Sequence, residues 1–394
     1  MKKFIYELQS RSDFVCTGSD CERDCCHGWD QIAVDQDTIT NWQETADEKT
    51  REFLVSLIDE NSEHGPQLKS KNNAACIALN DERLCSVQLQ YGHERLPDIC
   101  RVFPRLDFEN GKKVYRSASL SCPVIVEEAL FKNENSLFKI SEEGFNGDIS
   151  SNSALHEALD EFMNEVLAVS GYSLGIKLFF IADMFSDIIQ AIDLGGVSVY
   201  DIREATSNID AYLSEIKKAQ KANRIKANPV TSGSFWKSIY EYCYSRKINP
   251  EFLELEGAPL RRAVERCDSS FSSFGKIYSV IKKYKKKSSK FQGKQSDLFQ
   301  KYVQMIFINK GFPLTERLPL PVLLVESMIN MSLFQLLVWI EINKNGSLDE
   351  AFLKKCIVEV DRQSVLSDVI TKGLESNSQM MQVDKYCNAF LDLF

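Results

Sequence analysis

Cysteines crowd the first third of this chain, and they are its most reactive side chains. Eight of the twelve cysteines lie within the first 122 residues, and the other four are scattered singly. Thiols at such a density form either a disulfide framework or a metal site. The clustered set is Cys16, Cys21, Cys25, Cys26, Cys76, Cys85, Cys100 and Cys122.

The cellular compartment decides between these two uses. The N-terminal stretch MKKFIYELQSRSDF lacks the apolar core of a signal peptide, so we expect a cytoplasmic protein. Glutathione and thioredoxin keep cytosolic thiols reduced, which favours metal binding over disulfides. We therefore predict that the eight clustered cysteines bind metal.

The cysteine spacing bears on which metal is bound. It reads C-x4-C-x3-C-C and then C-x8-C-x14-C-x21-C, without the C-x2-C pair typical of a structural zinc site. An iron–sulfur cluster accepts looser spacing, because each iron needs only one outer thiolate. The pattern favours one or two iron–sulfur clusters, with zinc as the alternative. The side chains of Cys25 and Cys26 diverge as neighbours, so we expect one of them to bind a given ion.

Histidines near the cysteines are further candidate ligands. His27 adjoins the Cys25–Cys26 pair, and His93 lies in the same third of the chain. We favour a role for both as hydrogen-bond donors to the site or as surface residues, because such neighbours commonly tune a metal site. His64 and His156 are expected to be solvated.

The elements that must position the cysteines are short. Residues 1–132 hold brief apolar runs between turn signals and predict a small, irregular cysteine-rich metal domain. Asp35 or Asp37 is expected to cap one helix that runs towards Ile58, and Pro123 to begin another. Asn110-Gly111 favours a hairpin. The polar residues 133–153 predict a linker or long loop.

Residues 154–394 show apolar residues at helical spacing almost throughout and predict an all-α domain. The segment from Val322 to Ile342 is too polar for a membrane span and predicts a buried helix. Gly171 and Gly195-Gly196 lack the strand that precedes a dinucleotide-binding turn. Besides the segment 176–192, the predicted helices include 199–221, 233–246, 251–267, 270–287, 295–309, 320–343, 348–359 and 362–375.

The predicted fold class is therefore mainly α, with a small irregular cysteine-rich metal-binding N-terminal domain packed on an all-α helical C-terminal domain and no Rossmann-like sheet. The net charge of −9 argues against a nucleic-acid binder. The basic segment Lys282–Lys290 leaves two interpretations open. It is either a contact for a membrane surface or an acidic partner, or a solvated helix end.

Three motifs resemble the flagellin lysine-N-methylases, and together they cover about residues 14–125. The helices after Leu298 are similar to that family only in layout, and Phe103 stands where a tyrosine is expected. The cysteine region is also similar to a broader class of zinc- or iron-chelating proteins. The motifs are Cys21-Glu-Arg-Asp-Cys25-Cys26-His-Gly-Trp29, Leu96-Pro-Asp-Ile-Cys100-Arg-Val-Phe-Pro104-Arg105 and Ser119-Leu-Ser-Cys122-Pro123.

The resemblance implies an S-adenosylmethionine-dependent enzyme that methylates the ε-amino groups of surface lysines on flagellin. It also implies a [4Fe–4S] cluster on the cysteines. The radical-enzyme signature C-x3-C-x2-C is absent, because Cys26 directly follows Cys25. Two hypotheses for the cofactor stay open: an open iron binds its amino and carboxylate groups, or it occupies a pocket between the cysteine domain and the helices.

The residues that would assist the substrate lysine are not identified by the motifs. Asp98, Tyr91 and Tyr115 are candidates, with no basis for choosing among them. The alternative function is a non-enzymatic zinc- or iron-chelating or metal-sensing protein with a helical protein-binding domain. The oligomeric state is left open.

Overall fold

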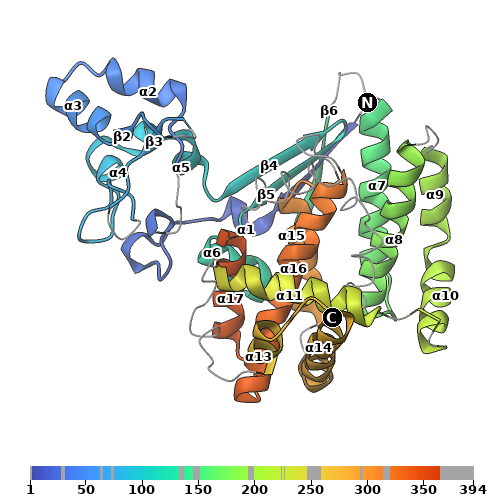
Figure 1. The fold of residues 1–394 in the computed structure, drawn as a ribbon. Coiled ribbons are helices and arrows are strands. Elements are labelled where there is room, and N and C mark those ends of the chain that lie inside the picture. Colours follow the sequence, from blue (N-terminus) through green and yellow to red (C-terminus); the bar gives the residue numbers. More distant parts are fainter. Residues whose placement is uncertain are drawn as a thin grey trace.

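The computed structural model has a small lobe, a four-stranded sheet and a helical body, which follow one another across Figure 1. The small lobe comprises residues 14–103, and the helical body comprises residues 151–363 together with the helix after Cys122. The structure describes residues 2–27, 32–62, 65–71, 75–132, 137–144, 151–193, 199–222, 224–225, 227–245, 259–292, 296–313 and 320–363.

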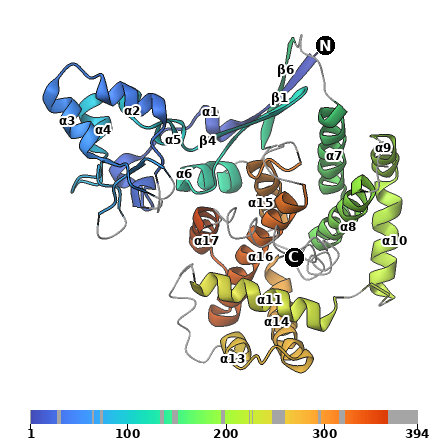
Figure 2. The same cartoon turned by 45° about the horizontal axis from the view of Figure 1, so that its top comes forward.

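The sheet joins the lobe to the body (Figure 2). Its strand order is β4-β5-β1-β6, with β1 parallel to β5 and the other neighbours antiparallel. The predicted hairpin at Asn110-Gly111 is confirmed, and Gly111 adopts a φ of 56° there. The strands are β1 (Lys2–Leu8), β4 (Arg105–Asn110), β5 (Lys113–Ala118) and β6 (Phe138–Gly144).

Strand β6 lies within the stretch predicted as a linker, so the expectation of a loop is wrong for Phe138–Gly144. The strand pairs with β1 along its whole length at the edge of the sheet. Only Phe138 is buried, and the polar residues after it are exposed. The composition of such an exposed edge strand resembles that of a loop. Its extended conformation is stabilised by backbone hydrogen bonds to β1, which the composition does not reveal.

The small lobe is built from short elements around its own apolar core. The helix predicted towards Ile58 is two helices, since Asp35 and Asp47 each cap a separate one. Trp42 is fully buried, and its Nε1 donates to the Arg95 carbonyl oxygen at 2.9 Å. The elements are η1 (Gly18–Asp20), η2 (Cys25–His27), α2 (Gln36–Gln43), α3 (Glu48–Ser56), β2 (Ile58–Asp59), β3 (Gln67–Leu68), α4 (Ser86–Tyr91), η3 (His93–Arg95) and α5 (Asp98–Val102).

The described residues from 151 onwards are helices and their connections, which confirms the mainly α fold. The predicted helix over 199–221 is two helices, and the predictions for 251–258 and for residues beyond 363 lie outside the described residues. The helices are α1 (Gln9–Ser12), α6 (Pro123–Val126), η4 (Glu127–Lys132), α7 (Ser151–Ala168), α8 (Leu174–Asp193), α9 (Val199–Ser207), α10 (Ile209–Lys221), α11 (Pro229–Ser245), α13 (Pro259–Glu265), α14 (Phe271–Gln292), α15 (Ser296–Asn309), α16 (Leu320–Asn345) and α17 (Glu350–Gln363).

Helix α16 forms the centre of the body. Among the described helices, its stretch Leu323–Asn345 alone is long and apolar enough to cross a membrane, and 94% of the window tested is buried inside the protein. The prediction of a buried helix is therefore confirmed. No Rossmann-like sheet occurs in the described part of the chain.

Two separate hydrophobic clusters show how the parts share their cores. The larger cluster contains the helical body together with Leu8, Tyr115 and Ala118 from the sheet. The smaller cluster lies within the lobe, around Trp42 and Leu54. The sheet strands therefore belong to the core of the body, although they precede it in sequence. Where each independently folding unit ends stays a prediction.

Candidate metal centre

The segment that carries the first four cysteines folds as two short 3-10 turns, η1 and η2. Gly18 begins η1 with a φ of 57°, a conformation that favours glycine. This turn directs the Gly18 N–H towards the Cys16 Sγ at 3.4 Å. The backbone conformation of this turn therefore positions the Cys16 thiol without the help of a metal ion.

Five cysteines form what we call the first thiol group: Cys25, Cys26, Cys76, Cys85 and Cys100. Thiolate charges at Cys25, Cys76 and Cys85 raise the pKa of Cys100, although burial is the larger cause of that increase. The same three charges act on Cys26, and the Cys76 N–H donates to the Cys26 carbonyl oxygen at 2.8 Å. Four separate pieces of the lobe thus contribute to one group of thiols.

The adjacent pair within this group is chemically asymmetric. The thiol of Cys26 donates a hydrogen bond to Cys25, which lowers the pKa of Cys25 to about 7 and raises that of Cys26. Cys25 is therefore the easier of the two to ionise, and a metal binds the thiolate form. The expectation that one member of the pair binds a given ion stays a prediction, and this asymmetry favours Cys25.

The other three cysteines, Cys16, Cys21 and Cys122, form the second thiol group. Burial and the charges at Cys21 and Cys16 raise the pKa of Cys122 to about 11. Two serines fix the loop before Cys122, because both Ser119 Oγ and Ser121 Oγ donate to the same oxygen of Asp361, at 2.9 and 2.8 Å. Pro123 then begins α6, as predicted.

Both groups open onto one cavity of about 410 Å³, which we call the thiol cavity. It lies between the cysteine segment, the α4–α5 region of the lobe and the residues around Cys122 and Arg362 at the body. Every clustered cysteine except Cys76 lines it, together with apolar side chains such as Phe14 and Phe103. The structure thus brings thiols from distant parts of the first third of the chain to a single place.

The thiols are suited to act as anionic ligands. Backbone N–H groups donate to the sulfurs of Cys76, Cys85 and Cys122, and these hydrogen bonds favour the thiolate. Burial works in the opposite direction and raises the pKa of each thiol. Hydrogen bonds of this kind also tune cysteine-bound iron–sulfur clusters. The thiols and their N–H donors therefore fit a metal centre bound through thiolates. A metal ion there would offset the cost of burying these thiolates.

The spread of the thiols bears on which centre they fit. Among the described residues, no three cysteine, histidine, aspartate or glutamate side chains are already arranged to hold one metal ion. A structural zinc site requires four donors about 2.0–2.3 Å from a single point. A cluster of several irons instead takes thiolates separated by a few ångströms more. The preference for a cluster over zinc therefore stays a prediction from the cysteine spacing.

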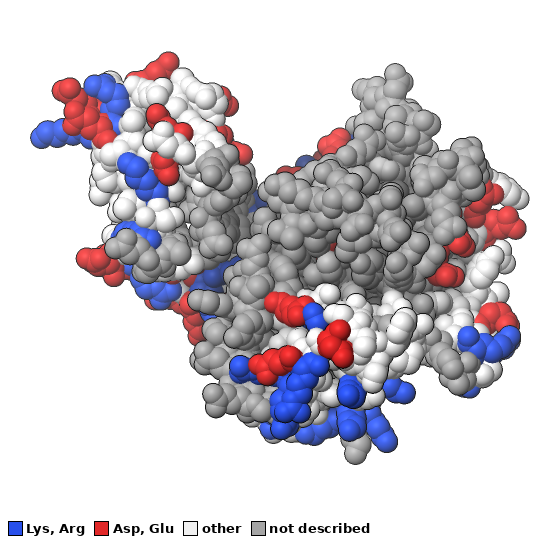
Figure 3. All heavy atoms as spheres, in the orientation of Figure 1, with Lys and Arg blue, Asp and Glu red and all other residues white. Residues whose placement is uncertain are grey.

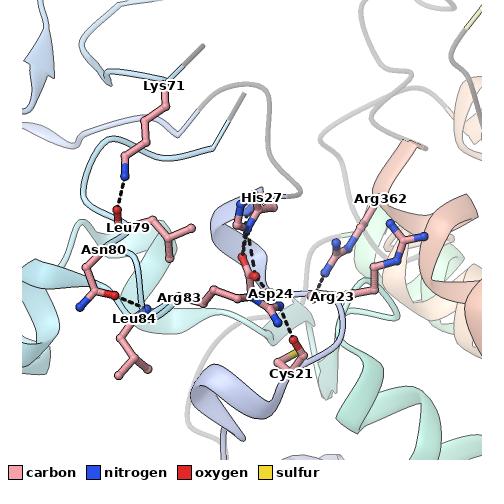
Figure 4. Close-up of polar contacts among 10 residues, drawn as sticks. All are labelled: Cys21, Arg23, Asp24, His27, Lys71, Leu79, Asn80, Arg83, Leu84 and Arg362. Atoms are coloured by element: carbon pink, nitrogen blue, oxygen red, sulfur yellow. Dashed lines mark hydrogen bonds and ion pairs between the residues drawn. The ribbon is translucent and has the colours of Figure 1, made fainter. Parts of the chain in front are cut away.

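Asp24 organises the polar edge of the cavity (Figure 4). Its carboxylate contacts His27 Nδ1 at 2.8 Å and Arg83 Nη2 at 2.8 Å. Burial raises the pKa of Asp24, but the hydrogen bonds from Arg83 and His27 outweigh it and leave the pKa lowered. This geometry gives His27 a supporting position beside the thiols. His93 lines the cavity, His64 lies outside the described residues, and His156 is buried, so its prediction as a solvated residue is wrong.

The three candidate assisting residues do not line the thiol cavity. Tyr115 is buried in the body, where its hydroxyl contacts Asp160 at 3.1 Å. Tyr91 packs against Phe53 in the lobe, and Asp98 begins α5 with its N–H bonded to Asp35. The motifs gave no information on side-chain direction, which is why they could not exclude these residues.

Arg362 is the cavity residue that sequence reasoning missed. It lies at the end of α17, far along the chain from the cysteines, and no local motif surrounds it. Its Nε donates to the Ser121 carbonyl oxygen at 3.2 Å, and its Nη2 donates to the Arg23 carbonyl oxygen. Figure 4 shows Arg362 and Arg23 side by side where the lobe meets the body.

The basic segment Lys282–Lys290 forms part of α14 on the body. Lys and Arg side chains gather at the lower end of the body in Figure 3. The apolar residues interleaved with the lysines, including Ile277, Ile281 and Tyr284, are buried in the large core. Packing in the core accounts for these apolar residues, and contact of the segment with a membrane or an acidic partner stays a prediction.

Comparison with known proteins identifies the same region. Residues 15–123 match the family model CxxCxxCC, described as "Putative zinc- or iron-chelating domain". In this chain the intervals are wider than that name indicates, with four and three residues between the first cysteines. No solved structure matches the chain.

Curated relatives come from Salmonella. The chain is 28% identical over 155 residues to a protein named lysine-N-methylase from Salmonella typhimurium, and equally to one from Salmonella choleraesuis. Each match covers 38% of this chain and 38% of the relative, so most of each relative's length lies outside it. The flagellar biosynthetic protein FliU of Salmonella muenchen is 31% identical over 121 residues, which cover 30% of this chain and 71% of FliU.

Proposed function

The chain belongs to the family of the flagellar protein FliU and the lysine-N-methylases, and from this we propose that it is an S-adenosylmethionine-dependent protein-lysine N-methyltransferase acting on flagellin. The observation that carries the proposal is the thiol cavity, whose lining comes mostly from residues 15–123, the part that matches the zinc- or iron-chelating domain. A chelator needs only ligands, whereas this chain places its thiols beside an apolar and cationic cavity next to a large body.

We propose a [4Fe–4S] cluster as the resident metal centre, with zinc as the alternative. The ligands are drawn from Cys16, Cys21, Cys25, Cys26, Cys76, Cys85, Cys100 and Cys122. The donor chemistry and the N–H bonds to sulfur support a thiolate-bound centre, and the loose cysteine spacing in the sequence favours a cluster. Such a cluster supplies a redox-active iron centre that can accept an outer ligand.

The proposed reaction is transfer of a methyl group from the sulfonium to a lysine amine. The deprotonated amine forms a new N–C bond while the C–S bond breaks, and S-adenosylhomocysteine and a proton are released. The chain's contribution is to hold both reactants in line and exclude water. A radical route stays an alternative, and a cleaved S-adenosylmethionine product under reducing, anaerobic conditions would support it.

A groove of about 1230 Å³ adjoins the thiol cavity and supports a protein substrate. The two share Thr17, Cys21, Arg23, Pro123 and Val124, so the groove leads directly to the thiols. Seven carboxylates and five basic side chains line the groove. This excess of negative charge suits a substrate segment that carries a lysine. We propose that the lysine-bearing part of flagellin lies in this groove.

We place the activity in the bacterial cytoplasm, where flagellin is present before export and thiols stay reduced. Contact of Lys282–Lys290 with a membrane surface or an acidic partner is a weaker proposal, because α14 packs its apolar face into the core. Sedimentation with anionic vesicles tests it: neutralising Lys285, Lys286 and Lys287 to glutamine should abolish any binding. Unchanged sedimentation would remove the surface role.

Methyl transfer to flagellin tests the proposed function. The anaerobically purified protein is incubated with flagellin and S-adenosylmethionine labelled in its methyl group, and digested flagellin is analysed by mass spectrometry. We expect label on lysines, and none when the metal has been removed. Protein that retains its metal and binds flagellin but leaves every lysine unlabelled would favour the metal-sensing alternative.

A further inference from the structure

Arginines outnumber carboxylates in the lining of the thiol cavity, although the net charge of the chain is −9. Four guanidinium groups line the cavity, those of Arg23, Arg83, Arg105 and Arg362. Among the described lining residues, Asp24 supplies the single carboxylate. A cavity with this lining is suited to a ligand that carries a negative group on a largely apolar body.

Three of these arginines are already engaged with other side chains. Arg83 pairs with Asp24 at 2.8 Å, and Arg23 pairs with Glu359 at 2.8 Å. The guanidinium of Arg105 lies 5.5 Å from the centre of the Phe14 ring. Carboxylates balance the charges of Arg83 and Arg23, whereas Arg105 is stacked on a ring and keeps its charge.

Arg362 differs from the other three in what holds it. Within the described part of the chain, its two hydrogen bonds end on the carbonyl oxygens of Ser121 and Arg23, which are uncharged acceptors. They fix the guanidinium plane without neutralising it, and Glu359, the carboxylate that acts on it by charge, is shared with Arg23. Burial lowers the pKa of Arg362, which reflects the cost of keeping this charge away from water.

We propose that Arg362 binds the carboxylate of an amino-acid-bearing nucleoside in the thiol cavity, so that the S-adenosylmethionine site lies between the lobe and the body. A guanidinium binds a carboxylate through two parallel N–H bonds, and Arg362 is held in place for this before the ligand arrives. The cavity volume of about 410 Å³, part of which the metal centre on the thiols would fill, lies in the range of small-molecule sites. This inference rests on the proposed function and specifies its cofactor site.

Binding of two cofactor analogues by the full-length, metal-containing protein tests the inference. S-adenosylhomocysteine carries the carboxylate, whereas 5′-methylthioadenosine lacks the whole amino-acid part. In Arg362→Gln, calorimetry should show S-adenosylhomocysteine binding at least about tenfold weaker, the loss expected for a charged hydrogen bond, with 5′-methylthioadenosine binding unchanged. Arg362→Lys should recover part of the loss, because the charge is kept and the paired geometry is not.

Arg203→Gln is the matched control, because Arg203 is exposed on α9 of the body, away from the lobe (Figure 1). Unchanged 5′-methylthioadenosine binding shows that the cavity of Arg362→Gln is intact. Equal binding of S-adenosylhomocysteine by wild type and Arg362→Gln overturns the inference, as does equal weakening of both analogues or no binding by wild type. Selective weakening combined with an absence of methyl transfer contradicts the proposed function and leaves the cofactor site standing.

Discussion

The five thiols of the first group are carried by four pieces of backbone, because Cys25 and Cys26 are adjacent. Cys85 precedes α4 and Cys100 lies within α5, so a substitution at either removes one sulfur and leaves the other supports in place. The thiols of Cys85 and Cys100 both line the thiol cavity, together with those of Cys25 and Cys26. The metal should therefore depend on several members of the group at once.

We predict that Cys85→Ser and Cys100→Ser each lose more than half of their bound metal, because a serine hydroxyl is a poor substitute for a thiolate. Metal content per chain after anaerobic purification measures this. Cys267→Ser is the control, since Cys267 lies in the body beside Ser273 and in neither thiol group. Metal content equal to that of wild type in both variants would remove the first thiol group from the site.

Asp35 joins two elements of the lobe through one carboxylate. It accepts hydrogen bonds from the N–H and hydroxyl groups of Thr38, at 2.8 and 2.7 Å, and from the Asp98 N–H at 2.8 Å. Burial raises the pKa of Asp35, but these bonds outweigh it and leave the pKa lowered. The carboxylate therefore stabilises the fold above the unfolded-state pKa, and this contribution is lost as the pH falls through the folded-state pKa.

Asp35→Ala should destabilise the lobe by about 1–2 kcal/mol at neutral pH, the usual cost of a lost cap. The difference from wild type should begin to shrink as the pH falls below about 4, near the unfolded-state pKa, and should close only below the lowered folded-state pKa. Chemical denaturation across a pH series measures both effects. Asp37→Ala is the control with an expected change below about 0.5 kcal/mol, because Asp37 is exposed. A difference that stays constant as the pH falls below about 4 would contradict this prediction.

At the scale of elements, a buried ion pair connects the sheet to α7. Lys113 Nζ on β5 lies 2.7 Å from Asp160 Oδ2 on α7, and the Tyr115 hydroxyl contacts the same carboxylate. All three side chains are buried in the body. Removal of the carboxylate would leave a buried ammonium without its counter-charge.

We predict that Asp160→Ala lowers the free energy of unfolding by about 3–5 kcal/mol, the usual cost of breaking a buried pair. Glu161→Ala is the control: Glu161 is half exposed and lies 3.8 Å from the same ammonium, so its loss should cost less than about 1 kcal/mol. Urea denaturation of the two variants makes the comparison. A similar loss of unfolding free energy in both variants would show that the buried pair stabilises the fold no more than the exposed one.

The sequence predicted elements best where a single residue dictates them. Asp35 as a cap, Pro123 as a helix start and Asn110-Gly111 as a turn are each local signals, and the structure bears out all three. Strand β6 and the position of Arg362 depend on partners distant in the chain. No local pattern encodes such partners, so the strand read as a loop and the arginine was not singled out.

At the scale of the whole molecule, the lobe and the body have separate cores of unequal size. Contacts between them include the pair Arg23–Glu359 and the bond of Arg362 to the Arg23 carbonyl oxygen. A small core stapled by metal is expected to depend on that metal more than a large one does. Stability should therefore differ between the two parts.

We predict that metal removal increases hydrogen exchange across residues 32–103 at least tenfold and leaves α15 and α16 unchanged. The reason is that the lobe core loses its staple, whereas the body core contains no clustered cysteine apart from Cys122 among its described residues. Hydrogen-exchange mass spectrometry of metal-loaded and metal-free protein measures this. Equal deprotection of α16 would show that lobe and body unfold as one unit.

The central claim is that the clustered thiols hold an iron–sulfur centre at the cavity between lobe and body. Iron, acid-labile sulfide and zinc per chain, measured in anaerobically purified protein together with its visible absorbance, test this most directly. We predict brown protein with about four irons and four sulfides per cluster, as the [4Fe–4S] composition requires. Colourless protein with one or more stoichiometric zinc ions and no labile sulfide would contradict the claim.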